Sequence, residues 1–226
     1  MLRTLILLLL VPFASAKLKW RQISAKSDSD QFPAPRRDSS IGFIRAANQL
    51  VIFGGKGSEN FGDTWTFDLT YKNWTKWPET KDGAGGFIPE KRFSMVYGAA
   101  GNFFYISTGE YSGSPRTFFN DIVQFDYLKK SWRKLGENSN VKPETRYGSA
   151  GGIFDDGSGK NGFYVTHGFS GTRYSNTLKF DLDEEEWEEK FSGSNNYNPN
   201  YPHSRCLHAG TMTKPDELVM YGGCLG

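Results

Sequence analysis

The stretch Leu50-Val-Ile-Phe-Gly-Gly55 decides the fold of this 226-residue chain, because it is an apolar run that ends in two glycines and recurs. Related runs are Phe103-Phe-Tyr-Ile-Ser-Thr-Gly109, Phe163-Tyr-Val-Thr-His-Gly168 and Leu218-Val-Met-Tyr-Gly-Gly223. Their final glycines lie at intervals of 54, 59 and 55 residues. Self-similarity at such a period is the signature of an architecture built from repeated units.

Three further marks recur in a fixed order around this run. A Pro-x-x-Arg motif precedes it and ends at Arg92, Arg146 and Arg205, and a looser version at Pro35-Arg36-Arg37 supplies Arg37. A Phe-Asp pair and then a tryptophan follow the run, as Phe67-Asp68 with Trp74, Phe125-Asp126 with Trp132, and Phe180-Asp181 with Trp187. These marks predict the units 33–77, 89–135, 143–191 and an incomplete 202–226.

Each unit is expected to contain four short strands. The first follows the arginine, as in Arg92–Tyr97, and the second is the apolar run. The third alternates, with Trp65, Phe67 and Leu69 on one face, and the fourth carries the late tryptophan. A four-stranded unit of this size cannot bury both faces alone, and radial stacking around an axis solves that problem. The fold class is therefore predicted to be all-β.

Together these marks, with Asp63-Thr64-Trp65, resemble the Kelch repeat. The resemblance covers nearly all of residues 18–226 and implies a Kelch-type β-propeller of about 3.5 blades. The family members most similar in kind are the central domain of galactose oxidase and the attractin-like secreted proteins. Units two and three depart from the pattern, with Thr108 and His167 replacing the first glycine and with Val123 and Leu178 in the place of Trp65.

The two ends of the chain allow two interpretations. The segment 19–23, which contains Trp20, resembles the fourth-strand segment Ser131–Leu135, and Kelch propellers often close with such an outer strand. At the other end, unit four has its first two strands and lacks the third. Either the chain is part of a longer propeller, or Trp20 completes an unusual ring of four blades.

The first sixteen residues are predicted to be a secretory signal peptide. Arg3 is followed by the apolar run Leu5 to Val11 and by small residues up to Ala16. That run is too short to span a bilayer, and no later segment is apolar enough. The sequon Asn73-Trp74-Thr75 fits a glycosylated extracellular protein. We therefore expect a secreted protein with no membrane span.

The two cysteines, Cys206 and Cys224, flank a predicted turn at Lys214-Pro215-Asp216-Glu217. A hairpin centred near 215–216 puts Cys206 opposite position 224 or 225, so we expect a disulfide across it. Two free buried thiols are the alternative.

No catalytic constellation or metal site is recognisable in the sequence. The formal net charge is only +2, which argues against a nucleic-acid binder. Neither a nucleophile elbow nor a phosphate-binding loop occurs, and the three histidines complete no set of four metal ligands. The acidic run 183–189 is expected to be a solvated face. We expect a non-catalytic protein without a cofactor; the alternative is a fragment of a secreted galactose or glyoxal oxidase-like enzyme whose catalytic residues lie outside the chain.

Two sets of residues are candidates for binding a protein or glycan ligand. The loops after the glycines present aromatic residues and arginines. These residues are candidates because such side chains are enriched in contact hot spots. The loops supply Tyr111, Arg116, Phe169, Arg173 and Tyr174. The second set is the ring of repeat arginines, Arg37, Arg92, Arg146 and Arg205. These arginines could instead satisfy buried carbonyl groups.

Overall fold

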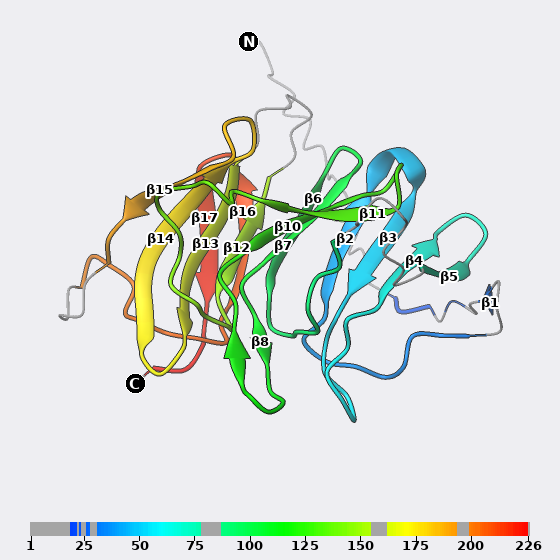
Figure 1. Cartoon of the computed structure of the whole chain (residues 1–226), viewed down its shortest axis with the longest axis horizontal. Coiled ribbons are helices and arrows are strands. Elements are labelled where there is room, and N and C mark those ends of the chain that lie inside the picture. The colour runs from blue at the N-terminus through cyan, green and yellow to red at the C-terminus, as the bar shows by residue number, and fades with distance from the viewer. Residues whose placement is uncertain are drawn as a thin grey trace, which may run out of the picture.

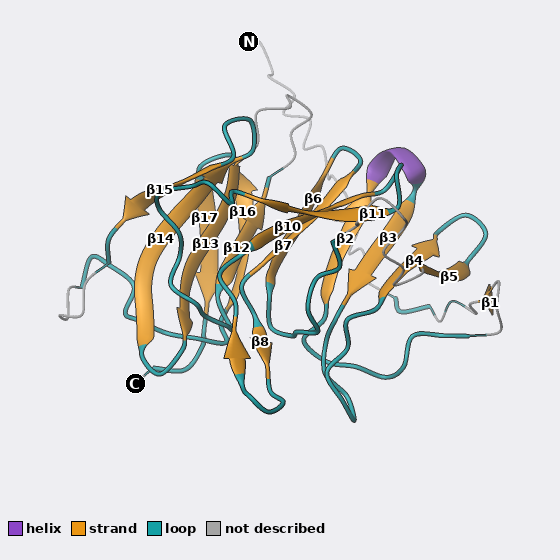
Figure 2. Ribbon diagram, viewed as in Figure 1, coloured by secondary structure: helices purple, strands orange, loops and turns teal. Residues whose placement is uncertain are grey.

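The computed structural model describes residues 19–21, 23, 26–27, 31–77, 87–154, 162–193 and 199–225. In this part of the chain the regular structure is almost entirely β, apart from the short 3-10 helix Arg45–Ala47 (Figure 2). Successive antiparallel sheets stand side by side in chain order (Figure 1), and their first strands contact one another. The all-β fold with Kelch-type blades is therefore confirmed. No helix among the described residues is long and apolar enough to cross a membrane.

Each of the first three blades has four antiparallel strands that fall inside one predicted unit. Blade 1 contains β2 (Ser40–Ile44), β3 (Gln49–Phe53), β4 (Thr64–Asp68) and β5 (Asn73–Trp77). Blade 2 contains β6 (Val96–Ala100), β7 (Phe103–Ser107), β10 (Ile122–Asp126) and β11 (Ser131–Leu135). Blade 3 contains β12 (Ala150–Ile153), β13 (Gly162–Phe169), β14 (Arg173–Asp181) and β15 (Glu186–Phe191).

Three smaller pieces of β-structure complete the described fold. Blade 4 consists of the hairpin β16 (Ala209–Lys214) and β17 (Glu217–Tyr221). The short pair β8 (Glu110–Tyr111) and β9 (Thr117–Phe118) forms a hairpin in the loop of blade 2. A two-residue strand, β1 (Lys26–Ser27), pairs in parallel with β5.

The expected closing strand around Trp20 is not formed by the described part of its segment. Lys19, Trp20, Arg21 and Ile23 lie outside strands, and the Trp20 side chain is fully exposed. The physical reason is that β16 and β17 form a sheet of two strands, so no third described strand of blade 4 is present to pair with it. The predicted signal peptide, residues 1–16, lies outside the described residues.

The first strand of each blade begins later than expected. In blade 2 the expectation was Arg92, whereas β6 begins at Val96. Between them Ser94 has a φ of 53°, in the left-handed region, which breaks the extended run. The equivalent residues Asp38, Gly148 and Leu207 have φ values of 55°, 62° and 56°.

These left-handed residues form a row of hydrogen bonds from blade to blade. The Ser94 amide donates to the Asp38 carbonyl over 2.9 Å. The Gly148 amide donates to the Ser94 carbonyl over 3.1 Å, and the Leu207 amide donates to the Gly148 carbonyl over 2.8 Å. We call these four residues the peptide row. It links the inner ends of all four described blades through the backbone alone.

Large aromatic side chains fill the space between blades, as the repeated tryptophans predicted. The Trp132 ring lies 5.0 Å from Phe53 of blade 1 and 5.2 Å from Phe125 of its own blade. Its indole nitrogen donates to the Thr64 hydroxyl of blade 1 over 3.0 Å. Near the axis, Gly42 allows close approach, because a Cβ there would lie 2.4 Å from the Phe104 ring of blade 2. Apolar burial of this kind is the main favourable term in blade stacking.

The aspartate of each Phe-Asp pair caps the turn between the third and fourth strands. Asp126 accepts hydrogen bonds from the amides of Leu128 and Lys129 over 2.9 and 3.0 Å. Asp68 and Asp181 make the equivalent pair of bonds in blades 1 and 3. The motif therefore has a local structural role in forming an Asx turn.

Candidate binding surface

The repeat arginines hold the backbone of their own blades together. Arg92 donates to the Glu90 carbonyl over 3.1 Å and to the Thr108 carbonyl over 3.4 Å. Arg146 bonds in the same way to the carbonyls of Glu144 and His167, both over 3.1 Å. Arg205 bonds to the carbonyls of His203 and Gly222. Arg92 and Arg146 are 1% and 0% exposed, so their side chains have no surface with which to touch a partner.

In blade 1 the residue with this geometry is Arg36, and the prediction of Arg37 from the sequence was wrong by one position. Arg36 donates to the carbonyls of Ala34 and Gly54, each over 3.0 Å, and forms a two-point ion pair with Asp63 over 2.6 and 2.9 Å. Hydrogen bonds from Arg36 and Trp65 outweigh the effect of burial and lower the pKa of Asp63. The stricter motif that starts at Pro33 ends at Arg36 and would have identified it.

An aromatic ring covers each buried guanidinium. Phe119 lies 3.7 Å from the Arg92 guanidinium, and Tyr174 lies 4.1 Å from that of Arg146. Tyr174, one of the predicted binding residues, also exchanges a hydrogen bond with the Ser170 hydroxyl over 2.9 Å. These rings supply cation–π contacts to charges that have left water.

The residue after each repeat arginine pairs across the blade with the residue after the second glycine. The four pairs are Arg37–Lys56, Phe93–Glu110, Tyr147–Phe169 and Cys206–Cys224. Each pair exchanges two backbone hydrogen bonds of 2.9–3.3 Å. We call these four pairs the bridge row. This row was not predicted as a surface from the sequence, although its positions are fixed by the same motifs that define the repeat.

Aromatic rings of the bridge row contact one another from blade 2 to blade 3. Tyr147 lies at the centre, stacked on Phe118 at 5.7 Å and edge-on to Phe169 at 6.0 Å. Phe93 contacts the same tyrosine at 6.5 Å. Among these, Tyr147, Phe118 and Phe169 remain partly exposed. The structure thus gathers aromatic rings from two neighbouring blades.

Cationic side chains stand over these rings. Arg116 lies 4.8 Å from the Phe118 ring, and Arg173 lies 5.6 Å from the Phe169 ring. Lys56 and Arg37 lie 5.0 and 5.8 Å from Phe93. Arg116 is tethered to Glu110 over 2.9 Å, and that contact raises the pKa of Arg116. Because the Arg116 side chain is 53% exposed, it keeps donors available for a partner.

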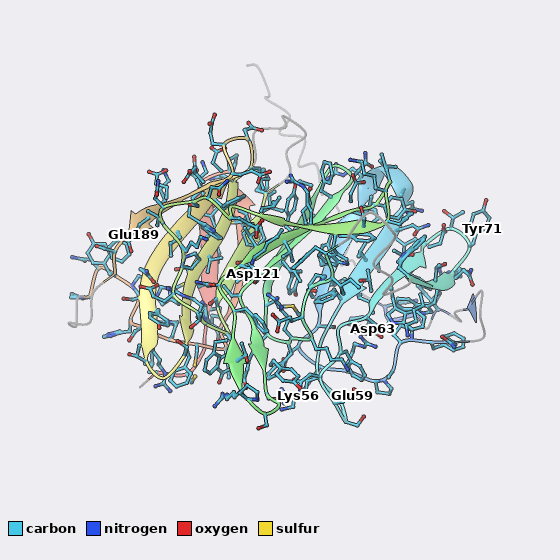
Figure 3. The ribbon with its side chains drawn as sticks, viewed as in Figure 1. Lys56, Glu59, Asp63, Tyr71, Asp121 and Glu189 are labelled. Atoms are coloured by element: carbon cyan, nitrogen blue, oxygen red, sulfur yellow. The ribbon has the colours of Figure 1, made fainter. Side chains whose placement is uncertain are left out.

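The loops that carry these residues lie at one end of the blades. Figure 3 shows Lys56 and Glu59 at this end, which is also the end where β8 lies in Figure 1. The loops of blades 1 and 2 are joined there by hydrogen bonds from the amide and hydroxyl of Ser112 to the Asn60 side chain, over 3.3 and 3.1 Å. Tyr111 is partly exposed beside this junction. We call the bridge row and these loops the loop-end surface.

A cleft of about 1020 Å³ lies between the first strands of the blades. Its wall includes the half-exposed side chains of Ile41, Phe43 and Tyr97. Much of the remaining wall is backbone, because glycine and alanine are frequent in these strands. The part of the chain described by the structure holds no group of three or more side chains suited to a metal ion.

Two buried histidines meet between blades 3 and 4. The rings of His167 and His208 lie 5.5 Å apart, and the residues are 3% and 8% exposed. Among the described atoms, neither ring nitrogen of His208 has a hydrogen-bond partner. Burial, reinforced by the nearby positive charge of Arg205, lowers the pKa of both histidines to about 4. Both rings are therefore neutral at pH 7.

Cys206 and Cys224 face each other as the hairpin analysis expected. They form the fourth pair of the bridge row, and their sulfur atoms lie 2.7 Å apart. Asn73 opens β5 and is partly buried. The acidic run 183–189 is largely exposed, with Trp187 as its buried member. The disulfide and the glycan at Asn73 remain predictions.

Comparison with known proteins agrees with this architecture. Residues 7–223 match the KLHDC2/KLHL20/DRC7 Kelch-repeats domain. The chain is also similar to the F-box/kelch-repeat protein At1g51550 of Arabidopsis thaliana, with 26% identity over 204 residues that cover 87% of this chain and 40% of the relative. The chain therefore spans well under half the length of that relative, and these matches do not support a particular likeness to galactose oxidase or attractin. The chain belongs to the Kelch-repeat family and is a protein-interaction module of the Kelch-repeat type.

Proposed function

We propose that this chain binds an acidic segment of a partner protein on its loop-end surface. The observation that supports this proposal is the set of four cationic side chains, Arg37, Lys56, Arg116 and Arg173, that stand over aromatic rings of adjacent blades. Arginine and aromatic side chains are enriched among residues that carry binding energy. Carboxylates of a partner would accept hydrogen bonds from the guanidinium groups, while its apolar atoms would cover the rings.

The arginines of the chain fall into two groups, and this division supports the same binding surface. One group is buried and bonds to the backbone, and the other can contact a partner. Arg92 and Arg146 are fully buried and bonded to carbonyl groups, so they maintain the blades. Arg116 comes from the loop between β8 and β9, and Arg173 is the first residue of β14, where its backbone pairs with Phe169. Loops on a rigid scaffold can vary for recognition without loss of the fold.

The test compares two charge-matched variants in a binding assay. Proteins retained by the immobilised wild-type chain would be identified and then titrated one at a time against each variant. Arg116→Ala with Arg173→Ala should weaken the specific partner at least about tenfold, which corresponds to about 1.4 kcal/mol. Lys129→Ala with Lys134→Ala removes one exposed cation from the turn after β10 and another from the outer strand β11, and it should leave the affinity unchanged.

Three outcomes would contradict the proposal. Equal affinity of the two double variants would remove the loop-end surface from recognition. Unfolding of the loop double variant at lower urea than the wild type would assign Arg116 and Arg173 a structural role. Retention that disappears after the bound material is deglycosylated would identify a glycan as the ligand instead of a protein segment.

We also propose that the protein is secreted and glycosylated. The support is the sequence of residues 1–16, which has the features of a signal peptide, and the sequon at Asn73. Secretion by eukaryotic cells should yield a mature chain that begins at Lys17, as read by mass spectrometry. Asn73→Gln should remove the mass of one glycan. An intact Met1 on protein retained inside the cell would contradict this assignment.

A further inference from the structure

We propose that Cys224, Cys206 and Arg173 form a thiol–disulfide exchange site that reacts with low-molecular-weight disulfides. The site lies where blade 4 meets the loop of blade 3. It shares Arg173 with the proposed binding surface, but its chemistry requires only these three side chains and a small disulfide, and no partner protein.

The repeat itself brings the two cysteines together. In blades 1, 2 and 3 the bridge-row positions hold Arg37–Lys56, Phe93–Glu110 and Tyr147–Phe169, so blade 4 has cysteine at both positions of a structurally obligatory pair. The Cys206 amide donates to the Cys224 carbonyl over 3.3 Å, and the Cys224 amide donates to the Cys206 carbonyl over 2.9 Å. Such a hydrogen-bonded antiparallel pair has its Cα atoms about 5.5 Å apart, within the range that a disulfide can span.

The two thiols are inequivalent. Cys206 is 4% exposed, whereas Cys224 is only partly buried. Desolvation, together with hydrogen bonding to Cys224, raises the pKa of Cys206 to about 11. The pKa of Cys224 is lowered, first by the hydrogen bond from Cys206 and then by the Arg173 guanidinium, which outweigh its partial burial. Cys224 is therefore the thiol that reaches the nucleophilic thiolate form at lower pH.

Arg173 occupies a position suited to supporting this thiolate. It is the first residue of β14, its guanidinium lies over the Phe169 ring, and interaction with Cys224 raises the pKa of Arg173. Phe169 is paired with Tyr147 in the neighbouring member of the bridge row. The cation is thus held on blade 3 while the thiol that it stabilises belongs to blade 4.

The exchange proceeds in two balanced steps. The Cys224 thiolate attacks one sulfur of a small disulfide; a mixed disulfide forms, and the other half leaves as a thiolate that takes a proton from water. Cys206 then loses its proton to solvent and attacks the Cys224 sulfur, which forms the Cys206–Cys224 bond and releases the second half as a thiol. The protein loses two electrons, and the small disulfide gains them.

Alkylation of the reduced full chain tests the inequality of the thiols. At pH 8 iodoacetamide should modify Cys224 at least about tenfold faster than Cys206, as read by peptide mass spectrometry. Arg173→Gln should slow modification of Cys224 roughly two- to tenfold, and Arg173→Lys should restore most of the rate. Arg133→Gln removes a cation paired with Glu185 on the outer strand of blade 2 and should change neither rate.

Oxidised glutathione tests the exchange itself. The wild-type chain should lose two mass units as the internal disulfide forms. Cys206→Ser should instead accumulate a glutathione adduct on Cys224, and Cys224→Ser should form an adduct on Cys206 far more slowly. Equal alkylation of the two cysteines, an unchanged rate in Arg173→Gln, or the persistence of two free thiols in excess oxidised glutathione would each overturn the proposal. None of these readouts depends on a partner protein.

Discussion

In blade 2 the buried arginine of the repeat faces an aspartate, whereas in blade 3 it faces an asparagine. Arg92 forms a two-point ion pair with Asp121 over 2.5 and 3.0 Å. Arg146 donates to the Asn176 side chain over 2.8 Å and also pairs with Glu144, whose side chain is 55% exposed. The comparison shows that the repeat requires an arginine at this position to bond to the backbone. The group that balances the charge of the arginine can differ from blade to blade.

The same two blades differ at the first glycine position of the repeat. Blade 2 has Thr108 and blade 3 has His167, yet both residues keep the left-handed backbone, with φ values of 62° and 58°. Gly54 and Gly222 occupy this position in blades 1 and 4 with φ values of 67° and 74°. All four blades therefore share this backbone geometry, but only blade 3 has a titratable side chain at the position.

The largest expected effect is loss of the ion pair in blade 2. Asp121→Ala should lower the free energy of unfolding by about 3–5 kcal/mol, because it leaves the buried Arg92 cation without its counter-charge. Asn176→Ala should lower it by only about 1–3 kcal/mol, since Arg146 loses a neutral acceptor and keeps Glu144. Urea unfolding monitored by tryptophan fluorescence measures both. A larger loss in Asn176→Ala would reverse the comparison between the blades.

The next largest effect is a dependence of stability on pH, which should arise only in blade 3 and at its contact with blade 4. His167 and His208 have folded-state pKa values lowered to about 4 by burial, while an unfolded histidine titrates near 6.5. The unfolded chain therefore binds more protons in this range, and stability should fall as the pH drops from about 6.5 to about 4. The charged groups near the pair oppose protonation: Arg205 lowers the pKa of both histidines, and Arg146 lowers that of His167, against hydrogen bonds from His167 to the backbone of Pro202 and His203.

The expected loss at the acid end of this window is on the order of a few kcal/mol. Equilibrium unfolding at a series of pH values measures it. The variant His167→Asn with His208→Gln should flatten the dependence between pH 6.5 and 4, because both replacements stay neutral and asparagine tolerates the left-handed backbone. An unchanged pH profile in this double variant would show that other groups cause the acid loss.

The smallest effect concerns backbone strain at the shared position. Thr108→Gly should stabilise the protein by about 1 kcal/mol, because a β-branched residue in the left-handed region is strained. Differential scanning calorimetry should show a Tm higher by roughly 2–4 °C. Gly54→Ala is the opposite control: its Cβ would lie 2.5 Å from the Arg92 carbonyl oxygen, so it should destabilise. A lower Tm for Thr108→Gly would show that its side-chain contacts outweigh the strain.

The blades were predictable from the sequence because their marks are local and repeated. The apolar runs became β3, β7, β13 and β17, and Trp74, Trp132 and Trp187 all lie on fourth strands. The start of the first strands was wrong by several residues, since nothing in Ser94 or Asp38 announces a positive φ. The position of Arg36 was within reach, because Pro33 gives the stricter motif, but two adjacent arginines concealed it.

The candidate surface was predicted only in part. The loop residues Tyr111, Arg116, Phe169 and Arg173 do lie at one end, and Cys206 does face Cys224. The contact between His167 and His208 was missed, because it joins two blades whose relative packing leaves no mark in either segment alone. The central role of Tyr147 was missed for the same reason.

The peptide row has a consequence for how the blades come together and apart. Its amides at Ser94, Gly148 and Leu207 each donate a hydrogen bond to the preceding blade, so all the bonds of the row point in the same direction along the chain. Each amide reports the docking of its own blade onto its predecessor. Hydrogen exchange at these three amides can therefore measure separately how often each blade separates from the one before it.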